Sequence, residues 1–263
     1  MRAILVSVSG LSVAYRSAGR THRALDGVDL DIRSGERLAI IGESGSGKST
    51  MALALSGLLP ETARQSGRID WPGLDHTPLP GRDIGFVFQD ASASLNPVLR
   101  IGEQIAEVAR RHLGMGWPDA YRHALDLLAR VRIPQPQAAL RAYPHQLSGG
   151  QRQRVAIASA IAAKPKLLIA DEPTSALDMV VQAEIVALLD TLVREDKMTL
   201  LFITHDIALA SGFADRIAVF REARLIEAGQ TAAVLSSPAD PYTKSLIASH
   251  IDLATPPLIA ASA

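Results

Sequence analysis

The stretch Gly42-Glu43-Ser44-Gly45-Ser46-Gly47-Lys48-Ser49-Thr50 fits the pattern glycine, four residues, Gly-Lys-Ser/Thr. That is the pattern of a phosphate-binding loop. Its glycines let the backbone turn tightly and approach a phosphate with the N–H groups facing inwards. In such a loop Lys48 reaches the β- and γ-phosphates, and the Ser49 hydroxyl coordinates Mg²⁺. We predict that this stretch binds a nucleotide; the alternative is a glycine-rich turn that fits the pattern by chance.

The residues on either side of the loop supply the context that the motif requires. Arg37 to Ile41 predicts a buried strand, and Lys48 to Leu58 predicts a helix. A phosphate-binding loop lies between a strand and a helix in this order. The sequence therefore predicts an α/β fold built around the loop.

Composition narrows the class of protein. The 263 residues contain 27 Lys+Arg and 27 Asp+Glu, so the net charge is zero. This argues against nucleic acid as the main partner, although it leaves a local basic patch open. Cysteine is absent, which excludes disulfides, thiolate nucleophiles, iron–sulfur clusters and cysteine-based zinc sites. A reducing compartment fits this composition.

Neither a signal sequence nor a membrane helix is predicted. Met1 to Gly10 contains only a short apolar run and predicts a first strand. No apolar run approaches the roughly 18 residues that a membrane helix needs. We expect a soluble chain that reaches a membrane only through a partner.

The first 35 residues predict short strands. Ala3 to Val8 and Leu11 to Tyr15 are rich in β-forming residues, Arg16 to Arg23 predicts a loop, and Val28 to Ile32 alternates as a half-buried strand does. Tyr15 comes ahead of the phosphate loop, where its ring could stack on a base. Ordinary packing is the commoner role of a lone tyrosine and stays open.

A second group of predicted strands follows the loop. Pro60 to Pro80 is polar and rich in proline and glycine, and within it Gly67 to Asp70 predicts a hairpin arm. Ile84 to Phe88 predicts a compact strand, and Gln89 follows it directly. The carboxyl end of a strand in an α/β sheet faces the ligand crevice, which makes Gln89 a candidate site residue.

The pattern changes to a helical one from Asp90. Ala91 to Pro97 predicts a loop, whereas Gly102 to Leu113 and Ala120 to Val131 predict helices. Leu147-Ser148-Gly149-Gly150-Gln151 then opens a long helix through Ala163, with Ser148 as its N-cap. The first N–H groups of this helix form either an anion site or an ordinary capped helix start.

Two carboxylates follow a predicted buried strand. Four consecutive apolar residues, 167–170, precede Asp171 and Glu172, and such a run is typical of a strand buried on both faces. In a parallel sheet the pair would emerge beside the phosphate loop. Asp171 would then bind Mg²⁺ and Glu172 would polarise an attacking water, with a solvated turn as the alternative.

The last third of the chain predicts further strands and helices. Met198 to Thr204 predicts an apolar strand that ends at His205, which is either structural or a contact to the γ-phosphate. The seven histidines lack paired metal spacing, so we expect no histidine metal site. Other predicted features are a loop at 175–178, a helix to 194, a hairpin at 216–228, a helix starting at 241 and an apolar tail.

Together these motifs resemble those of the ATP-binding cassette (ABC) ATPases over essentially the whole chain. Leu147 to Gln151, between the two nucleotide motifs, separates this family from other phosphate-loop enzymes. The resemblance implies a phosphate-loop NTPase (RecA-like) α/β core at 1–89 and 151–235, with an antiparallel β subdomain. It also implies an inserted α-helical subdomain at 90–150, which contacts a membrane partner, and a short tail at 236–263.

The resemblance also assigns roles to single residues. It makes Tyr15 the adenine-stacking residue, Gln89 the residue that senses Mg²⁺ and nucleotide, and His205 the γ-phosphate switch. It makes Asp171 the metal-side aspartate, Glu172 the catalytic glutamate and Asp178 the subunit-bridging aspartate. ATP would lie between the phosphate loop of one subunit and residues Ser148, Gly149, Gly150 and Gln151 of another.

The working assembly implied is therefore two ATPase subunits, identical or sister chains, on two transmembrane permeases at the cytoplasmic face of the membrane. An extracytoplasmic solute-binding protein would deliver the solute. Within the family, the finer resemblance is to peptide and nickel importer ATPases. Its residues are Gln89-Asp90, Ser94-Leu95-Asn96-Pro97, Gly42-Glu43-Ser44 and Pro241-Tyr242-Thr243.

Two departures from this group leave the solute open between peptides, nickel or other metal chelates, and another solute. Ala91 stands where the group often has proline, and a cysteine-bearing C-terminal extension is missing. The short tail, Leu58-Leu59-Pro60 and Arg64-Gln65 are more similar to the nickel-type subunit.

Three alternatives fit the sequence less well. Soluble ABC ATPases of repair or translation usually carry a coiled-coil insertion or tandem cassettes, and we expect neither here. A kinase or GTPase would lack the 147–151 motif. A non-hydrolysing regulator would not need Glu172 and His205.

Overall fold

The computed structural model describes residues 2–17, 20–175 and 177–250. The chain divides into two compact units, Met1–Pro78 with Thr199–Ala263, and Leu79–Met198. The predicted apolar tail, from residue 251 on, lies outside the described residues. Among the described residues no helix is long and apolar enough to cross a membrane.

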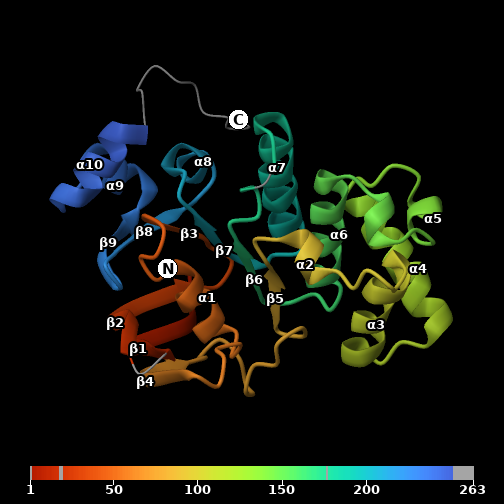
Figure 1. The fold of residues 1–263 in the computed structure, drawn as a ribbon, viewed down its shortest axis with the longest axis horizontal. Helices are drawn as coiled ribbons and strands as arrows, with labels where there is room; N and C mark the ends of the chain where they lie inside the picture. The colour runs from red at the N-terminus through yellow and green to blue at the C-terminus, as the bar shows by residue number, and fades with distance from the viewer. Residues whose placement is uncertain (1, 18–19, 176, 251–263) are drawn as a thin grey trace. The chain divides into compact units, whose positions relative to one another are not determined.

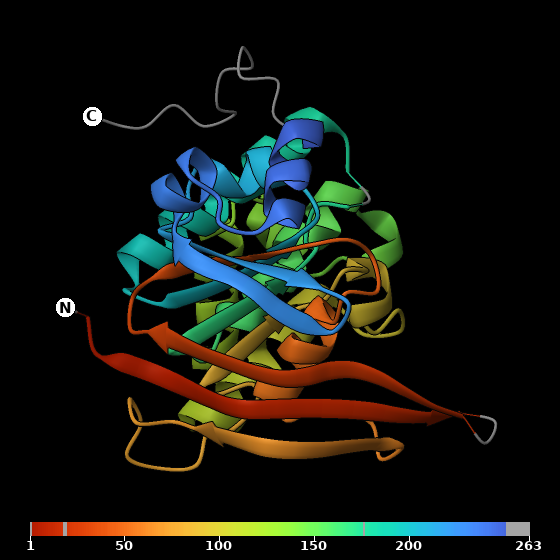
Figure 2. The same ribbon diagram turned by 90° about the vertical axis from the view of Figure 1, so that its left-hand side faces the viewer.

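The first unit contains an antiparallel sheet of order β2-β1-β4, whose strands run alongside one another in Figure 2. The strands are β1 (Ile4–Ser17), β2 (Arg20–Arg33) and β4 (Ala63–Asp70). The two short strands predicted before Tyr15 are one strand, because Gly10 adopts a positive φ of 58° and the pairing shifts register there. The loop predicted at Arg16 to Arg23 is wrong at both ends, since the β1–β2 pairing continues to Ser17 and Arg20.

The same unit contains the strands that position the phosphate loop (Figure 1). Their order is β7-β3-β8-β9, with β3 parallel to β7 and β8, and β8 antiparallel to β9. Their bounds are β3 (Arg37–Ile41), β7 (Thr199–Thr204), β8 (Arg216–Arg221) and β9 (Arg224–Gln230). The predicted strands at 37–41 and 198–204 and the hairpin at 216–228 are confirmed within a few residues.

The helices of this unit are α1 (Lys48–Leu55), α8 (Ile207–Ser211), α9 (Thr231–Ser236) and α10 (Pro241–His250). One apolar cluster joins α8, α9 and α10 to the strands β3 and β8. Ile41, the last residue of β3, is fully buried in that cluster. The C-terminal helix α10 therefore shares one apolar cluster with the strand that leads into the phosphate loop.

The second unit combines two parallel strands with helices. β5 (Ile84–Val87) pairs with β6 (Leu167–Asp171), in which all five residues are buried. The helices are α2 (Ala91–Ser94), α3 (Ile101–Leu113), α4 (Trp117–Arg130), α5 (Pro136–Ala139), α6 (Gly149–Ile161) and α7 (Met179–Glu195), with a 3₁₀ turn η1 (Pro144–Gln146). The loop predicted at Ala91 to Pro97 instead begins with α2, because the Asp90 carboxylate accepts the N–H groups of Ser92 and Ala93.

A partly buried ion pair at the start of β3 supports a first prediction. Asp215 accepts hydrogen bonds from the Arg37 guanidinium at 2.6 Å, the Arg2 guanidinium at 2.8 Å and the Arg37 N–H at 3.1 Å. Burial favours the neutral carboxyl, but these donors outweigh it and lower the pKa of Asp215 from 3.8 to about 2. The native state is therefore stabilised at pH values above 3.8, and this stabilisation is lost as the pH falls towards 2.

We expect Asp215→Asn to lower the free energy of unfolding by about 1 kcal/mol at neutral pH, allowing for solvent screening. The deficit should shrink as the pH falls from about 4 towards 2. Urea unfolding of both proteins over this range measures it, with the exposed Asp70→Asn as control. A deficit that stays constant with pH would contradict the assignment.

Candidate nucleotide-binding site

The phosphate loop connects β3 to α1, and its glycines occupy backbone conformations that other residues avoid. Gly42 has a φ of 152° and Gly47 a φ of 105°. A Cβ on Gly42 would lie 2.1 Å from the Phe220 carbonyl oxygen, and one on Gly47 would lie 2.4 Å from that of Ala24. Both glycines are therefore required by close approach of the backbone as well as by φ.

The interior of the loop presents polar groups that fit a phosphate. Lys48 is 4% exposed, and its ammonium donates to the carbonyl oxygens of Gly42 at 2.8 Å and of Glu43 at 2.7 Å. The Ser46 hydroxyl is buried and has no hydrogen-bond partner among the described residues. A buried cation and an unsatisfied donor are costly in a protein interior, and an anionic phosphate would stabilise both.

The contact at Gly42 gives a second prediction. We expect Gly42→Ala to destabilise the fold by about 1–3 kcal/mol beyond the cost of its positive φ, because the added methyl group overlaps backbone atoms. Gly57→Ala is the matched control: Gly57 also has a positive φ, but nothing lies within 4 Å of its Cβ. It should cost only about 1–2 kcal/mol. Thermal unfolding measures both variants, and equal losses would contradict the contact.

Two further predicted site residues lie in the first unit. The Tyr15 hydroxyl donates to the Thr50 hydroxyl at 3.3 Å, so the half-buried tyrosine is held beside the first turn of α1. His205 directly follows β7, whose last residue, Thr204, pairs with Ile41 at the end of β3. The histidine and the phosphate loop therefore begin at the same end of neighbouring parallel strands.

The second unit brings two other predicted residues together. Gln89 is the second residue after β5, and Glu172 follows β6 directly. The Gln89 side-chain amide donates to a Glu172 carboxylate oxygen at 3.2 Å. Asp171 is the buried last residue of β6, and Glu172 has a φ of 43°, which is rare for a residue with a side chain.

The motif at 147–151 forms the predicted helix start. Ser148 caps α6 by accepting from the Gln151 N–H at 3.3 Å, and the Gln151 side chain accepts from the Ser148 N–H at 2.9 Å. A Cβ on Gly150 would lie 2.9 Å from a methyl group of Val181. Asp178 caps α7 by accepting from the Val181 N–H at 3.0 Å. The structure therefore places the motif and Asp178 at adjoining helix starts.

Sequence reasoning missed two contacts made by residues close to these motifs. Arg152 donates to the Leu147 carbonyl at 3.0 Å and to the Ser92 hydroxyl at 2.7 Å, so it links the 147–151 motif to α2. Tyr242 lies within a quoted family motif, but no local pattern showed that its hydroxyl accepts the Glu43 N–H at 3.2 Å.

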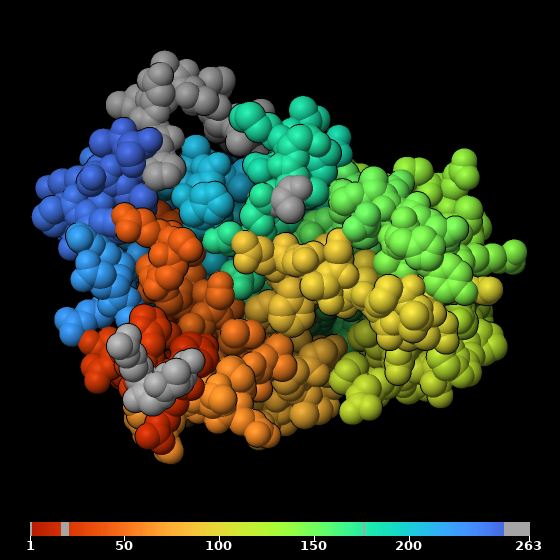
Figure 3. Space-filling view, viewed as in Figure 1, coloured from red at the N-terminus to blue at the C-terminus, as the bar shows by residue number. Residues whose placement is uncertain are grey.

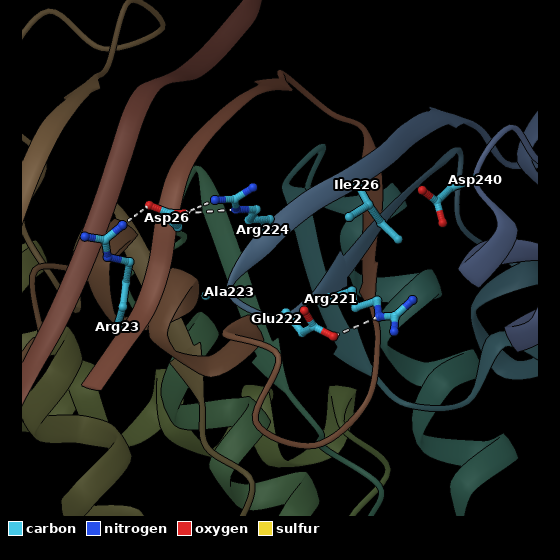
Figure 4. A pocket seen from close by; sticks show the side chains of 8 residues that line it. All are labelled: Arg23, Asp26, Arg221, Glu222, Ala223, Arg224, Ile226 and Asp240. Atoms are coloured by element: carbon cyan, nitrogen blue, oxygen red, sulfur yellow. Dashed lines mark hydrogen bonds and ion pairs between the residues drawn. The ribbon is translucent and has the colours of Figure 1, made fainter. Parts of the chain in front are cut away.

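A separate pocket of about 680 Å³ lies beside the β8–β9 turn (Figure 4). It is lined by Arg23, Asp26, Arg221, Glu222, Ala223, Arg224, Ile226 and Asp240. The Asp26 carboxylate accepts from Arg23 at 2.6 Å and from Arg224 at 2.6 Å, and Arg221 pairs with Glu222 at 3.3 Å. With Asp240, the lining carries three guanidinium groups and three carboxylates, and none of the predicted site residues lines the pocket.

Residues 25–175 match the family described as ABC transporter. This chain belongs to that family. A solved structure described as a dimeric, post-hydrolysis state of the ATP-binding cassette MJ0796 bound to ADP and Pi has 31% identity to it. The alignment covers 86% of this chain and 98% of the other, with a TM-score of 0.74. The predicted α/β phosphate-loop NTPase fold of the ABC family is therefore confirmed, and the family implies ATP binding.

Curated relatives of this ABC cassette are named for transport or import. The peptidoglycan transport ATP-binding protein YejF of Agrobacterium fabrum is 45% identical over 94% of the chain, which spans 47% of YejF. The glutathione import ATP-binding protein GsiA of Salmonella typhimurium is 42% identical over 93%, and the chain spans 42% of it. The oligopeptide transport ATP-binding protein OppD of Bacillus subtilis is 41% identical over 93%, and the chain spans 71% of it. The cassette thus spans less than half of the first two.

Proposed function

We propose that this chain is the ATP-hydrolysing subunit of an ABC importer for peptides. The phosphate loop carries the proposal, because its buried Lys48 ammonium and unsatisfied Ser46 hydroxyl suit a bound phosphate. The transport class comes from relatives named for oligopeptide, glutathione and peptidoglycan transport. The proposal assigns the loop of the first unit and the motifs of the second to one reaction.

In the proposed site the protein mainly positions groups and stabilises charge. Lys48 and the N–H groups of residues 42–50 bind the phosphates, and Tyr15 stacks on the adenine. Ser49 and Asp171, with Gln89 as sensor, would hold Mg²⁺, which neutralises phosphate charge when bound. The Ser49 hydroxyl and the Asp171 carboxylate are hard oxygen donors of the kind that Mg²⁺ prefers.

Hydrolysis then needs a water placed in line with the γ-phosphate. Glu172 orients this water and accepts its proton as the new oxygen–phosphorus bond forms, while the bond to the ADP oxygen breaks. His205 binds the γ-phosphate. The hydrogen bond from Gln89 holds the Glu172 carboxylate in the structure described, and we propose that nucleotide and Mg²⁺ change this contact.

A second cassette completes the proposed site. Residues Ser148 to Gln151 of that cassette would cover the nucleotide, and Asp178 would bridge the two subunits. Met179 and Val180, next to Asp178, are 72% and 71% exposed, which suits burial against another protein. The related cassette solved as a dimer supports this arrangement.

The remaining partners follow from the transport proposal. Two permeases would span the membrane, with this chain at their cytoplasmic face, and an extracytoplasmic binding protein would deliver the solute. The chain should be co-purified with its permeases and binding protein and reconstituted in liposomes. We expect dipeptides, oligopeptides or glutathione to stimulate its ATPase activity. Stimulation only by nickel chelates would move it to the nickel group, and stimulation only by DNA or ribosomes would reject transport.

A further inference from the structure

We propose that Tyr242 of α10 is a positioning residue of the phosphate loop, through which the C-terminal helix is coupled to nucleotide binding. The inference rests on the proposed binding of ATP. It concerns a residue nearly 200 positions away from the loop, and the contact that carries it is the hydrogen bond from the Glu43 N–H to the Tyr242 hydroxyl, 3.2 Å long.

The tyrosine is fixed by its surroundings. It is 8% exposed and packs in the apolar cluster that contains Ile41 of β3 and Val219 of β8. Ile41 is the last residue of the strand that leads into the loop. The Tyr242 ring and the start of the loop are therefore fixed by the same apolar cluster. Burial raises the pKa of the Tyr242 hydroxyl, so it keeps its proton at neutral pH. In the space-filling view the blue C-terminal segment borders the orange segment that carries the loop (Figure 3).

The end of β8 holds the same part of the loop from a second direction. The carbonyl of Phe220 closes the space beside Gly42. The next residue, Arg221, places its guanidinium 4.8 Å from the centroid of the Tyr242 ring, at cation–π distance. β8 therefore contacts Gly42 and α10 contacts the Glu43 N–H, although Glu43 as a whole is exposed.

Helix α10 is itself tied to the sheet at its first turn. The Tyr242 N–H donates to the Asp240 carboxylate at 2.7 Å. The N–H groups of Ala239 and Asp240 donate to the Glu227 carboxylate of β9 at 2.8 and 3.1 Å. Burial opposes ionisation of Glu227, but these donors outweigh it and lower its pKa. The Glu227 carboxylate therefore stays charged and keeps its hydrogen bonds to the residues before α10. These bonds hold the first turn of α10, from which Tyr242 projects.

The contact bears on nucleotide binding through Glu43. Its carbonyl oxygen accepts from the Lys48 ammonium at 2.7 Å, while its N–H is held by Tyr242. A phosphate bound by Lys48 competes with this carbonyl for the three donors of the ammonium. Tyr242 adds a contact to Glu43 that does not involve Lys48. A neutral hydrogen bond of this kind corresponds to about a two- to tenfold change in affinity.

Tyr242→Phe removes the hydroxyl and keeps the ring, its packing and the Arg221 contact. We expect the dissociation constant of a fluorescent ATP analogue and the KM for ATP to rise about two- to tenfold, with kcat nearly unchanged. Amide hydrogen exchange at Glu43 should become faster. Tyr121→Phe in α4 of the other unit is the matched control and should change none of these values.

A second measurement needs no variant. Because coupling between two sites is reciprocal, ATP with Mg²⁺ should slow hydrogen exchange in the α10 peptide of the unaltered chain. If the unaltered chain binds no ATP, the proposed function fails. If it binds ATP but nucleotide leaves α10 exchange unchanged, or Tyr242→Phe binds ATP as tightly as the unaltered chain, the coupling is rejected and the proposed function stands.

Discussion

Replacing Glu172 with glutamine should lower ATP turnover about 100-fold or more, the scale of one general base, while ATP binding is retained. The amide matches the carboxylate in size and keeps an oxygen that can accept from the Gln89 amide, as Glu172 does at 3.2 Å. It cannot accept a proton from the attacking water. Turnover is measured with the permeases and binding protein present, and binding is measured with a fluorescent ATP analogue.

Glu195→Gln is the matched control for this variant. Glu195 ends α7 in the same unit, is 58% exposed and pairs with Arg130 at 3.2 Å. Its loss should leave turnover unchanged, since exposed ion pairs contribute little. Turnover of the Glu172 variant close to that of the unaltered protein would refute the catalytic assignment.

Lys48→Ala should weaken ATP binding about 10- to 100-fold, because hydrogen bonds to a charged group are worth about 1.5–3 kcal/mol. Turnover should fall by about two orders of magnitude or more, since the charge that stabilises the transferred phosphate is lost. The ammonium also holds the carbonyls of Gly42 and Glu43, so the empty loop should exchange its amide hydrogens faster.

Lys166→Ala is the matched control, because it removes a lysine side chain from an exposed position just before β6. It should leave nucleotide binding and turnover unchanged. Circular dichroism and thermal unfolding confirm that both variants are folded. If the Lys48→Ala variant binds ATP as tightly as the unaltered protein, the loop is a glycine-rich turn and not a phosphate-binding site.

Slower hydrogen exchange in α10 on nucleotide binding would show that the C-terminal helix and the phosphate loop of the first unit act together. Helix α10 and the phosphate loop are 199 residues apart at their contact. Loss of that contact changes affinity, whereas loss of Glu172 changes turnover. The two variants therefore separate the positioning of the loop from the chemistry.

The elements closest to the motifs were predicted well. The strand at 37–41, the helix from Lys48 and the capped helix at Ser148 all appear. Each depends on neighbouring residues: an apolar run, a glycine pattern or a capping side chain. The predictions failed at 16–23, where strand pairing extends through polar residues, and at 91–94, where the Asp90 cap starts a short helix.

By itself the sequence determined the phosphate loop, the 147–151 helix start and the carboxylate pair at the end of β6. It could do so because the chemistry of each lies in contiguous residues. Only the tertiary structure decided that Gln89 meets Glu172, 83 residues away, and that Tyr242 holds Glu43. Those contacts depend on which strand ends and helix starts become neighbours, and sheet pairing and burial of the shared apolar cluster set that arrangement.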